Sequence, residues 1–97
     1  MGIDVIEEKN LNDVITYAVE YPRMVLMEAR PLVPQGTALQ DFAYGLYIGY
    51  ISGVFFDGFL RRNNRFLNDE EVSDFHAILF KRTPEIWLKI KAHLQIK

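Results

Sequence analysis

Two histidines and a group of acids are the residues of this sequence that have the chemistry of acid–base catalysis or metal binding. His76 and His93 are the only histidines, and neither has a partner at the H-x-x-x-H or H-E-x-x-H spacing that holds zinc on a helix. Glu70, Glu71 and Asp74 lie close before His76, but acids in this position are typical of a solvated first helical turn. The sequence therefore predicts no catalytic residue, no metal site, no cofactor and no enzyme activity.

A basic cluster is the second group with binding chemistry. Arg61, Arg62 and Arg65 surround Asn63 and Asn64, and guanidinium groups bind the phosphates or carboxylates of a partner. Cations at the C-terminal end of a helix also complement its dipole. Both interpretations stay open from sequence, and the three arginines are candidate partner-binding residues.

The segment that must position this cluster is a long uncharged stretch. No charged residue occurs from Phe42 to Phe56, between Asp41 and Asp57. As a helix these fifteen residues span about 22 Å, short of the roughly 30 Å of a bilayer core. We therefore expect a buried central helix over about 37–62 and no membrane contact.

This helix has one face of small residues. At 100° per residue, these small residues fall within one narrow sector of the helix. Glycine has a low helix propensity, and the close approach of a second helix would offset that cost. An internal crossing, with the helix at 11–21 or with the C-terminal helix, is the favoured interpretation, and a homodimer contact is the alternative. The face contains Gly45, Gly49, Ser52 and Gly53. A bulky stripe for the interior contains Tyr44, Ile48, Ile51, Phe55 and Phe59.

The remaining strip of the helix is its most polar one. It carries Tyr47, Tyr50, Val54, Asp57 and Arg61, and we expect it to face outward. Tyrosine supplies contact area with a polar tip and is enriched in interfaces. Tyr47 and Tyr50 are therefore candidate partner-binding residues.

The flanking elements are predicted from the periodicity of apolar residues and from residues that begin or end helices. A helix over 11–21 is expected after an N-cap at Asn10. The apolar run within 23–30 fits a short helix better than a short buried strand, and both stay open.

Cap residues predict the starts of the later helices. Thr37 and Gln40 read as a capping box that opens the central helix. Asn68 is expected to cap a helix that ends near Lys81, and Thr83 to cap the last one.

Composition limits the class of protein. The chain has 97 residues, no cysteine, 49% hydrophobic and 25% charged residues, which is a normal globular balance. Its acidic N-terminus lacks the pattern of a signal peptide. We expect one compact all-α domain over 1–97, with four to five helices, in the cytoplasm.

Charge is unevenly distributed along the chain. Residues 1–57 carry a net charge of −5, and residues 58–97 a net charge of +3. A small non-enzymatic protein-binding module, an inhibitor, adaptor or accessory factor, is the favoured function. Binding of nucleic acid by the basic C-terminal half is the alternative.

Overall fold

The structure is a computed structural model, and it describes residues 2–95. Six helices and no strand occur among these residues: α1 (Val5–Glu20), α2 (Pro22–Leu26), α3 (Ala29–Leu32), α4 (Leu39–Asn63), α5 (Asp69–Lys81) and α6 (Thr83–Leu94). Two of them have only five and four residues, so the predicted all-α fold around a long central helix is confirmed. The alternative of a strand within 23–30 is wrong, since this segment forms α2 and the start of α3.

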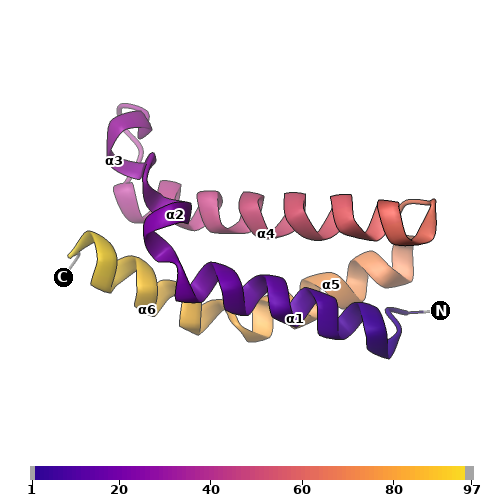
Figure 1. The fold of residues 1–97 in the computed structure, drawn as a ribbon. Coiled ribbons are helices and arrows are strands. Elements are labelled where there is room, and N and C mark those ends of the chain that lie inside the picture. Colours follow the sequence, from indigo (N-terminus) through magenta and orange to yellow (C-terminus); the bar gives the residue numbers. More distant parts are fainter. Residues whose placement is uncertain (1, 96–97) are drawn as a thin grey trace.

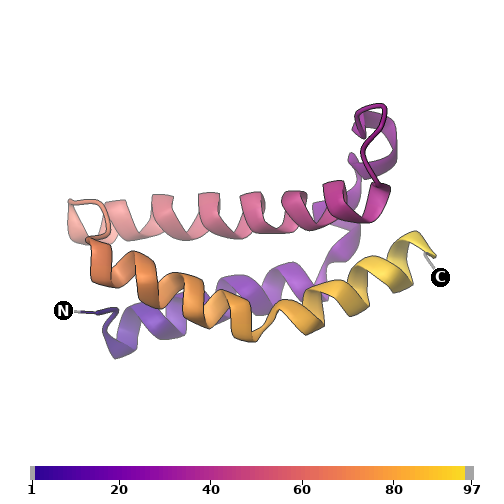
Figure 2. The same cartoon turned by 180° about the vertical axis from the view of Figure 1, so that it is seen from behind.

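The long helix α4 runs along one side of the molecule, which measures 41 × 22 × 20 Å. On the other side, α1 lies beside the consecutive helices α5 and α6 (Figures 1 and 2). The short helix α2 packs against α4, α6 and α1, and α3 with the turn after it rises past the N-terminal end of α4 in both views. The molecule is therefore an elongated helical bundle of α4, α1 and the consecutive helices α5 and α6, with α3 projecting at one end (Figure 1).

The first helix is longer than predicted. It begins at Val5 rather than at Leu11, because the Asp4 carboxylate accepts a hydrogen bond from the Glu7 backbone N–H (2.8 Å) and caps the helix. The predicted cap at Asn10 is wrong. Asn10 lies inside α1, where its side-chain amide donates to the Glu7 carboxylate (3.2 Å).

The central helix begins without a side-chain cap. Ala38 occupies the N-cap position, so the predicted capping box of Thr37 and Gln40 is wrong. A turn with Gly36 at φ +85° precedes it, and the Thr37 backbone N–H closes this turn. Because the turn uses Thr37, the helix starts at Leu39, too late for the Thr37 hydroxyl to cap it.

The connection between α4 and α5 follows the sequence signals. Asn64 takes the left-handed conformation (φ 55°) and its N–H donates to the Leu60 carbonyl (2.8 Å), which ends α4. The Asn68 side chain accepts from the Glu71 backbone N–H and the Glu71 carboxylate accepts from the Asn68 N–H, both at 2.8 Å. The predicted cap at Asn68 is confirmed and forms a reciprocal capping box.

The last helix starts one residue before the predicted position. Arg82 is its N-cap and Thr83 is its first residue, so the predicted Thr83 cap is wrong. The Thr83 hydroxyl donates instead to the Leu79 carbonyl of the preceding helix (3.3 Å). The Arg82 backbone N–H donates to the same Leu79 carbonyl (3.1 Å), so both groups close the tight junction of α5 and α6.

The core lies between α4 and the other three long helices. It is almost entirely aliphatic and aromatic, and each fully buried side chain contributes about 1.5–3 kcal/mol. Its largest members are Leu11, Ile15, Tyr47, Ile51, Phe55, Phe59, Phe75, Ile86 and Ile90. Among the residues that the structure describes, no helix is at once long and apolar enough to cross a membrane.

Candidate functional site

Tyr47 is not on the surface. Its exposed fraction is 0%, so the prediction that it faces outward is wrong. Burial raises the pKa of Tyr47 to about 12, and no described group lies within hydrogen-bond distance of its hydroxyl. Tyr47 is therefore a core residue and contacts no partner.

The reason is the spacing of the buried row of α4. The buried residues recur at every fourth position, as Ala43, Tyr47, Ile51, Phe55 and Phe59. A four-residue step advances by 400°, so this row winds slowly around the helix and takes in the small Ala43. In the predicted bulky stripe Ile51, Phe55 and Phe59 are buried, whereas Tyr44 and Ile48 are only partly buried and pack against the edge of the core.

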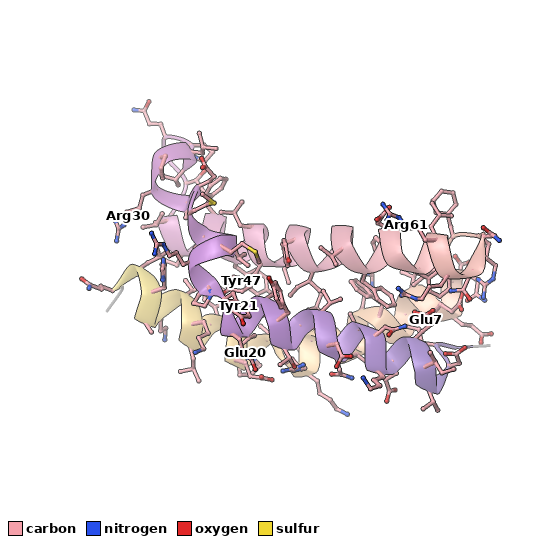
Figure 3. The ribbon with its side chains drawn as sticks, viewed as in Figure 1. Glu7, Glu20, Tyr21, Arg30, Tyr47 and Arg61 are labelled. Carbon is pink, nitrogen blue, oxygen red and sulfur yellow. The ribbon has the colours of Figure 1, made fainter. Side chains whose placement is uncertain are left out.

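Arg62 forms an ion pair with a carboxylate of the same chain. Its Nε and Nη2 donate to the two oxygens of Glu7 at 3.0 and 2.7 Å, and the Asn63 amide donates to the same group at 3.0 Å. Chiefly through the bonds from Arg62, the pKa of the Glu7 carboxyl falls to about 2. This cluster joins the start of α1, where Figure 3 labels Glu7, to the end of α4.

The other two arginines of the predicted cluster are also paired. Arg65 donates to both oxygens of the buried Glu71 at 2.7 and 3.0 Å and lowers the pKa of that carboxyl. Arg61 pairs with Asp57 at 3.0 Å within α4. The cluster is therefore largely neutralised by carboxylates, which weakens its interpretation as a phosphate-binding patch.

A groove between α1 and α4 brings several candidate residues together. Its volume is about 830 Å³, and an adjoining hollow of about 400 Å³ shares Asp13, Val14 and Val54 with it. The groove ends at Arg61 and Arg62, and Tyr50 and Tyr17 line the adjoining hollow. Tyr50, Arg61 and Arg62 thus lie along one surface, while Arg65 and Tyr47 do not line it.

The floor of this groove is apolar and its rims carry paired charges. Val54 is 43% exposed, and the glycines beside it leave α4 without side chains at Gly53 and Gly58. On the α1 rim, Lys9 pairs with Asp13 at 2.9 Å. On the α4 rim the pair is the one formed by Asp57 and Arg61. The surface therefore offers apolar contact between rims of no net charge.

An aromatic pair extends the groove toward α2. The rings of Tyr17 and Tyr21 lie 4.6 Å apart, and Tyr21 opens a further hollow of about 490 Å³ lined by Met24 and Met27. Tyr17 also faces Tyr50, whose pKa is raised by burial and by Tyr17. None of Tyr17, Tyr21, Met24 and Met27 was predicted to bind a partner. Only Tyr17 has a signal in the sequence, because it is an aromatic residue off the apolar face of α1.

The glycine face of α4 does not pack against the chain. Gly45, Gly49 and Gly53 are exposed, and a Cβ added at any of them would meet no atom within 4 Å. The favoured interpretation, an internal helix crossing, is therefore wrong. Ser52 is partly exposed on the same side.

The histidines lie apart from any acid–base arrangement. His76 is exposed beside the ring of Phe75 (5.6 Å between ring centroids), and His93 is exposed near the end of α6. Within residues 2–95, no three histidine, aspartate or glutamate side chains gather as metal ligands do.

No protein-family model matches the chain, and the searches of curated proteins and of solved structures found no match either.

Proposed function

We propose that this protein is a small protein-binding module that accepts an apolar segment of a partner protein in the groove between α1 and α4. The observation that carries the proposal is the continuity of this groove from Arg61 through Val54 to the Tyr17–Tyr21 pair. Contiguous exposed apolar surface bordered by polar residues is typical of protein interaction sites.

The residue types of the groove fit this function. Tyr17, Tyr21 and Tyr50 are rigid side chains with an apolar ring and a polar tip, and aromatic residues and methionines are enriched in interfaces. Met24 and Met27 are flexible and adapt to the shape of a bound side chain. An amphipathic helix laid between α1 and α4 would place apolar residues on Val14 and Val54, as in other helix-in-groove complexes.

The charges of the groove favour a protein over a nucleic acid. The exposed cations at this groove are paired with carboxylates of the same chain: Lys9 with Asp13, Arg61 with Asp57, and Arg62 with Glu7. Affinity for nucleic acid depends on cations that are free to replace the counterions of phosphates. Binding in this groove should therefore change little with salt concentration.

The test is a selection of displayed helical peptides of about 16 residues, roughly 24 Å of helix, on the immobilised protein. Peptides enriched on the wild type should bind Val54→Glu at least about tenfold more weakly, because the carboxylate would lie on the apolar floor. The matched control is Val5→Glu, at an exposed valine of α1 that does not line the groove, and it should bind like the wild type. Equal binding by Val54→Glu, or no enrichment at all, would contradict the proposal.

A further inference from the structure

Two arginines of this chain have no carboxylate partner. Arg23 and Arg30 are exposed, and neither forms an ion pair within residues 2–95. The other four of the six arginines pair with carboxylates of the same chain at 2.7–3.0 Å, namely Arg61, Arg62, Arg65 and Arg82. Since the chain neutralises those four, Arg23 and Arg30 are the guanidinium groups that remain for an anionic group of a partner.

Both arginines line the same hollow. This basic hollow, of about 510 Å³, lies where α2 and α3 meet the end of α6, and His93 and Leu94 form its α6 side. Arg30 Nη2 donates to the Leu94 carbonyl (2.7 Å), and Figure 3 shows the Arg30 side chain beside the end of α6. That bond orients the guanidinium and uses one of its five N–H donors, so Arg30 is held in place and keeps donors for a ligand.

The fold explains the position of Arg30 but not that of Arg23. A cation at the C-terminal end of α6 complements the carbonyl groups there, which is a structural role for Arg30. Within residues 2–95, Arg23 forms no hydrogen bond or ion pair. Glu20 lines a neighbouring hollow, but it does not pair with Arg23, and Figure 3 shows it well apart from Arg30. The basic hollow therefore has two guanidinium groups and no carboxylate in its lining.

An apolar hollow adjoins the basic one. Tyr21 and Met24 line this methionine hollow, of about 490 Å³, and Arg23 and Met27 line both hollows. Met27 is 64% exposed, so apolar surface continues from the methionine hollow to the rim of the basic hollow. A ligand that fits both hollows combines an apolar group with an adjacent anionic group.

We propose that the partner segment bound in the groove ends in an apolar residue beside an acidic residue, and that Arg23 and Arg30 bind the carboxylate of that acid. This inference rests on the proposed function and adds the chemistry of the partner, because the methionine hollow continues the groove past Tyr21. Charge complementarity selects the acid. An uncharged or basic end would leave both guanidinium groups without a carboxylate.

The test is a selection from displayed helical peptides of about 24 residues, roughly 36 Å of helix, which extend beyond the groove at Tyr21. Peptides enriched on the wild type should carry Asp or Glu near one end and bind Arg23→Gln about three- to fivefold more weakly. Arg23 makes no polar contact within residues 2–95, so this variant should keep the fold. The matched control, Lys81→Gln, removes the same charge at an exposed residue that lines neither hollow and should bind like the wild type.

A double-mutant cycle identifies the contact. Replacing the acid of the peptide by its amide should weaken binding to the wild type as much as Arg23→Gln does, with no further loss in that variant. The difference between wild type and Arg23→Gln should shrink between about 50 mM and about 500 mM salt. Enriched peptides without an acid, or equal binding by Arg23→Gln, would overturn this inference alone, provided that Val54→Glu still weakens binding. No enrichment on the wild type would contradict both the inference and the proposed function.

Discussion

The Arg62 guanidinium holds the buried Glu7 carboxylate through two hydrogen bonds of 2.7 and 3.0 Å across 55 positions of the chain. Asn63 and Asn10 donate to the same carboxylate. The cluster therefore joins α1 and α4 at the end of the molecule opposite α3 (Figure 1). An arginine that resembled a ligand-binding residue is part of the fold.

Replacing Arg62 by methionine should lower the free energy of unfolding by about 2 kcal/mol. The change leaves the Glu7 carboxylate buried without its two charged hydrogen bonds. Lys9→Met is the matched control, since it removes an exposed ion pair with Asp13 and should cost less than about 0.5 kcal/mol. Urea unfolding of both variants measures the difference, and equal losses would contradict a structural role for Arg62.

The stability conferred by Glu7 should depend on pH. Its pKa in the folded protein is about 2, lowered from 4.5, so the folded state favours the ionised form. This contribution, about 3 kcal/mol, is fully present above pH 5 and is lost as the pH falls from 4.5 toward 2. The gap in unfolding free energy between the wild type and Glu7→Gln should therefore be larger at pH 6 than at pH 2.5. A gap independent of pH would show that the Glu7 carboxyl is not ionised more readily in the folded protein.

The elements that could be predicted from sequence are those defined by local signals. Asn68 caps α5 as expected, and α4 ends at Asn63, next to the predicted end at 62, because helix caps act within a few residues. At Thr37 and Thr83 the same type of signal was present, but neighbouring turn geometry moved the start of the helix by one or two residues.

The rotation of α4 could not be predicted, because it depends on contacts distant in sequence. Its first half packs against α2 and α3 as well as α6, and Tyr44 stacks on Trp87 with ring centroids 4.8 Å apart. These neighbours bury Ala43 and Tyr47. A helical wheel that sorts residues by size cannot identify them.

The pairing of the arginines is likewise a tertiary feature. Glu7 and Glu71 both occur at positions where an acid is typical of a solvated first turn. Each is instead buried under an arginine from the end of α4 or the loop after it. The three arginines all remain exposed and Tyr50 is partly exposed, but only Arg61 finds its carboxylate on its own helix.

Tyr47→Phe should raise the free energy of unfolding by up to about 1 kcal/mol. The substitution keeps the buried ring and removes a hydroxyl that has no described hydrogen-bond partner. Peptide binding in the groove should not change. The control Tyr44→Phe removes a hydroxyl near the Thr83 oxygen (3.4 Å) and should be neutral or slightly destabilising. A large loss of stability in Tyr47→Phe, measured by thermal unfolding, would indicate that the hydroxyl is satisfied after all.

Two glycines of α4 should respond to alanine with opposite signs. Gly45 has open space around it, so Gly45→Ala should stabilise the helix by up to about 1 kcal/mol and raise Tm by roughly 4 °C. A Cβ at Gly58 would lie 2.6 Å from Arg62 Nη1. That side chain cannot move away freely because Glu7 holds it, so Gly58→Ala should lower Tm despite the better helix propensity of alanine. In the Arg62→Met background, a Cβ at position 58 has no guanidinium to displace. There, Gly58→Ala should leave Tm unchanged or raise it. If Gly58→Ala lowers Tm equally in both backgrounds, the strain does not involve the pair of Arg62 and Glu7.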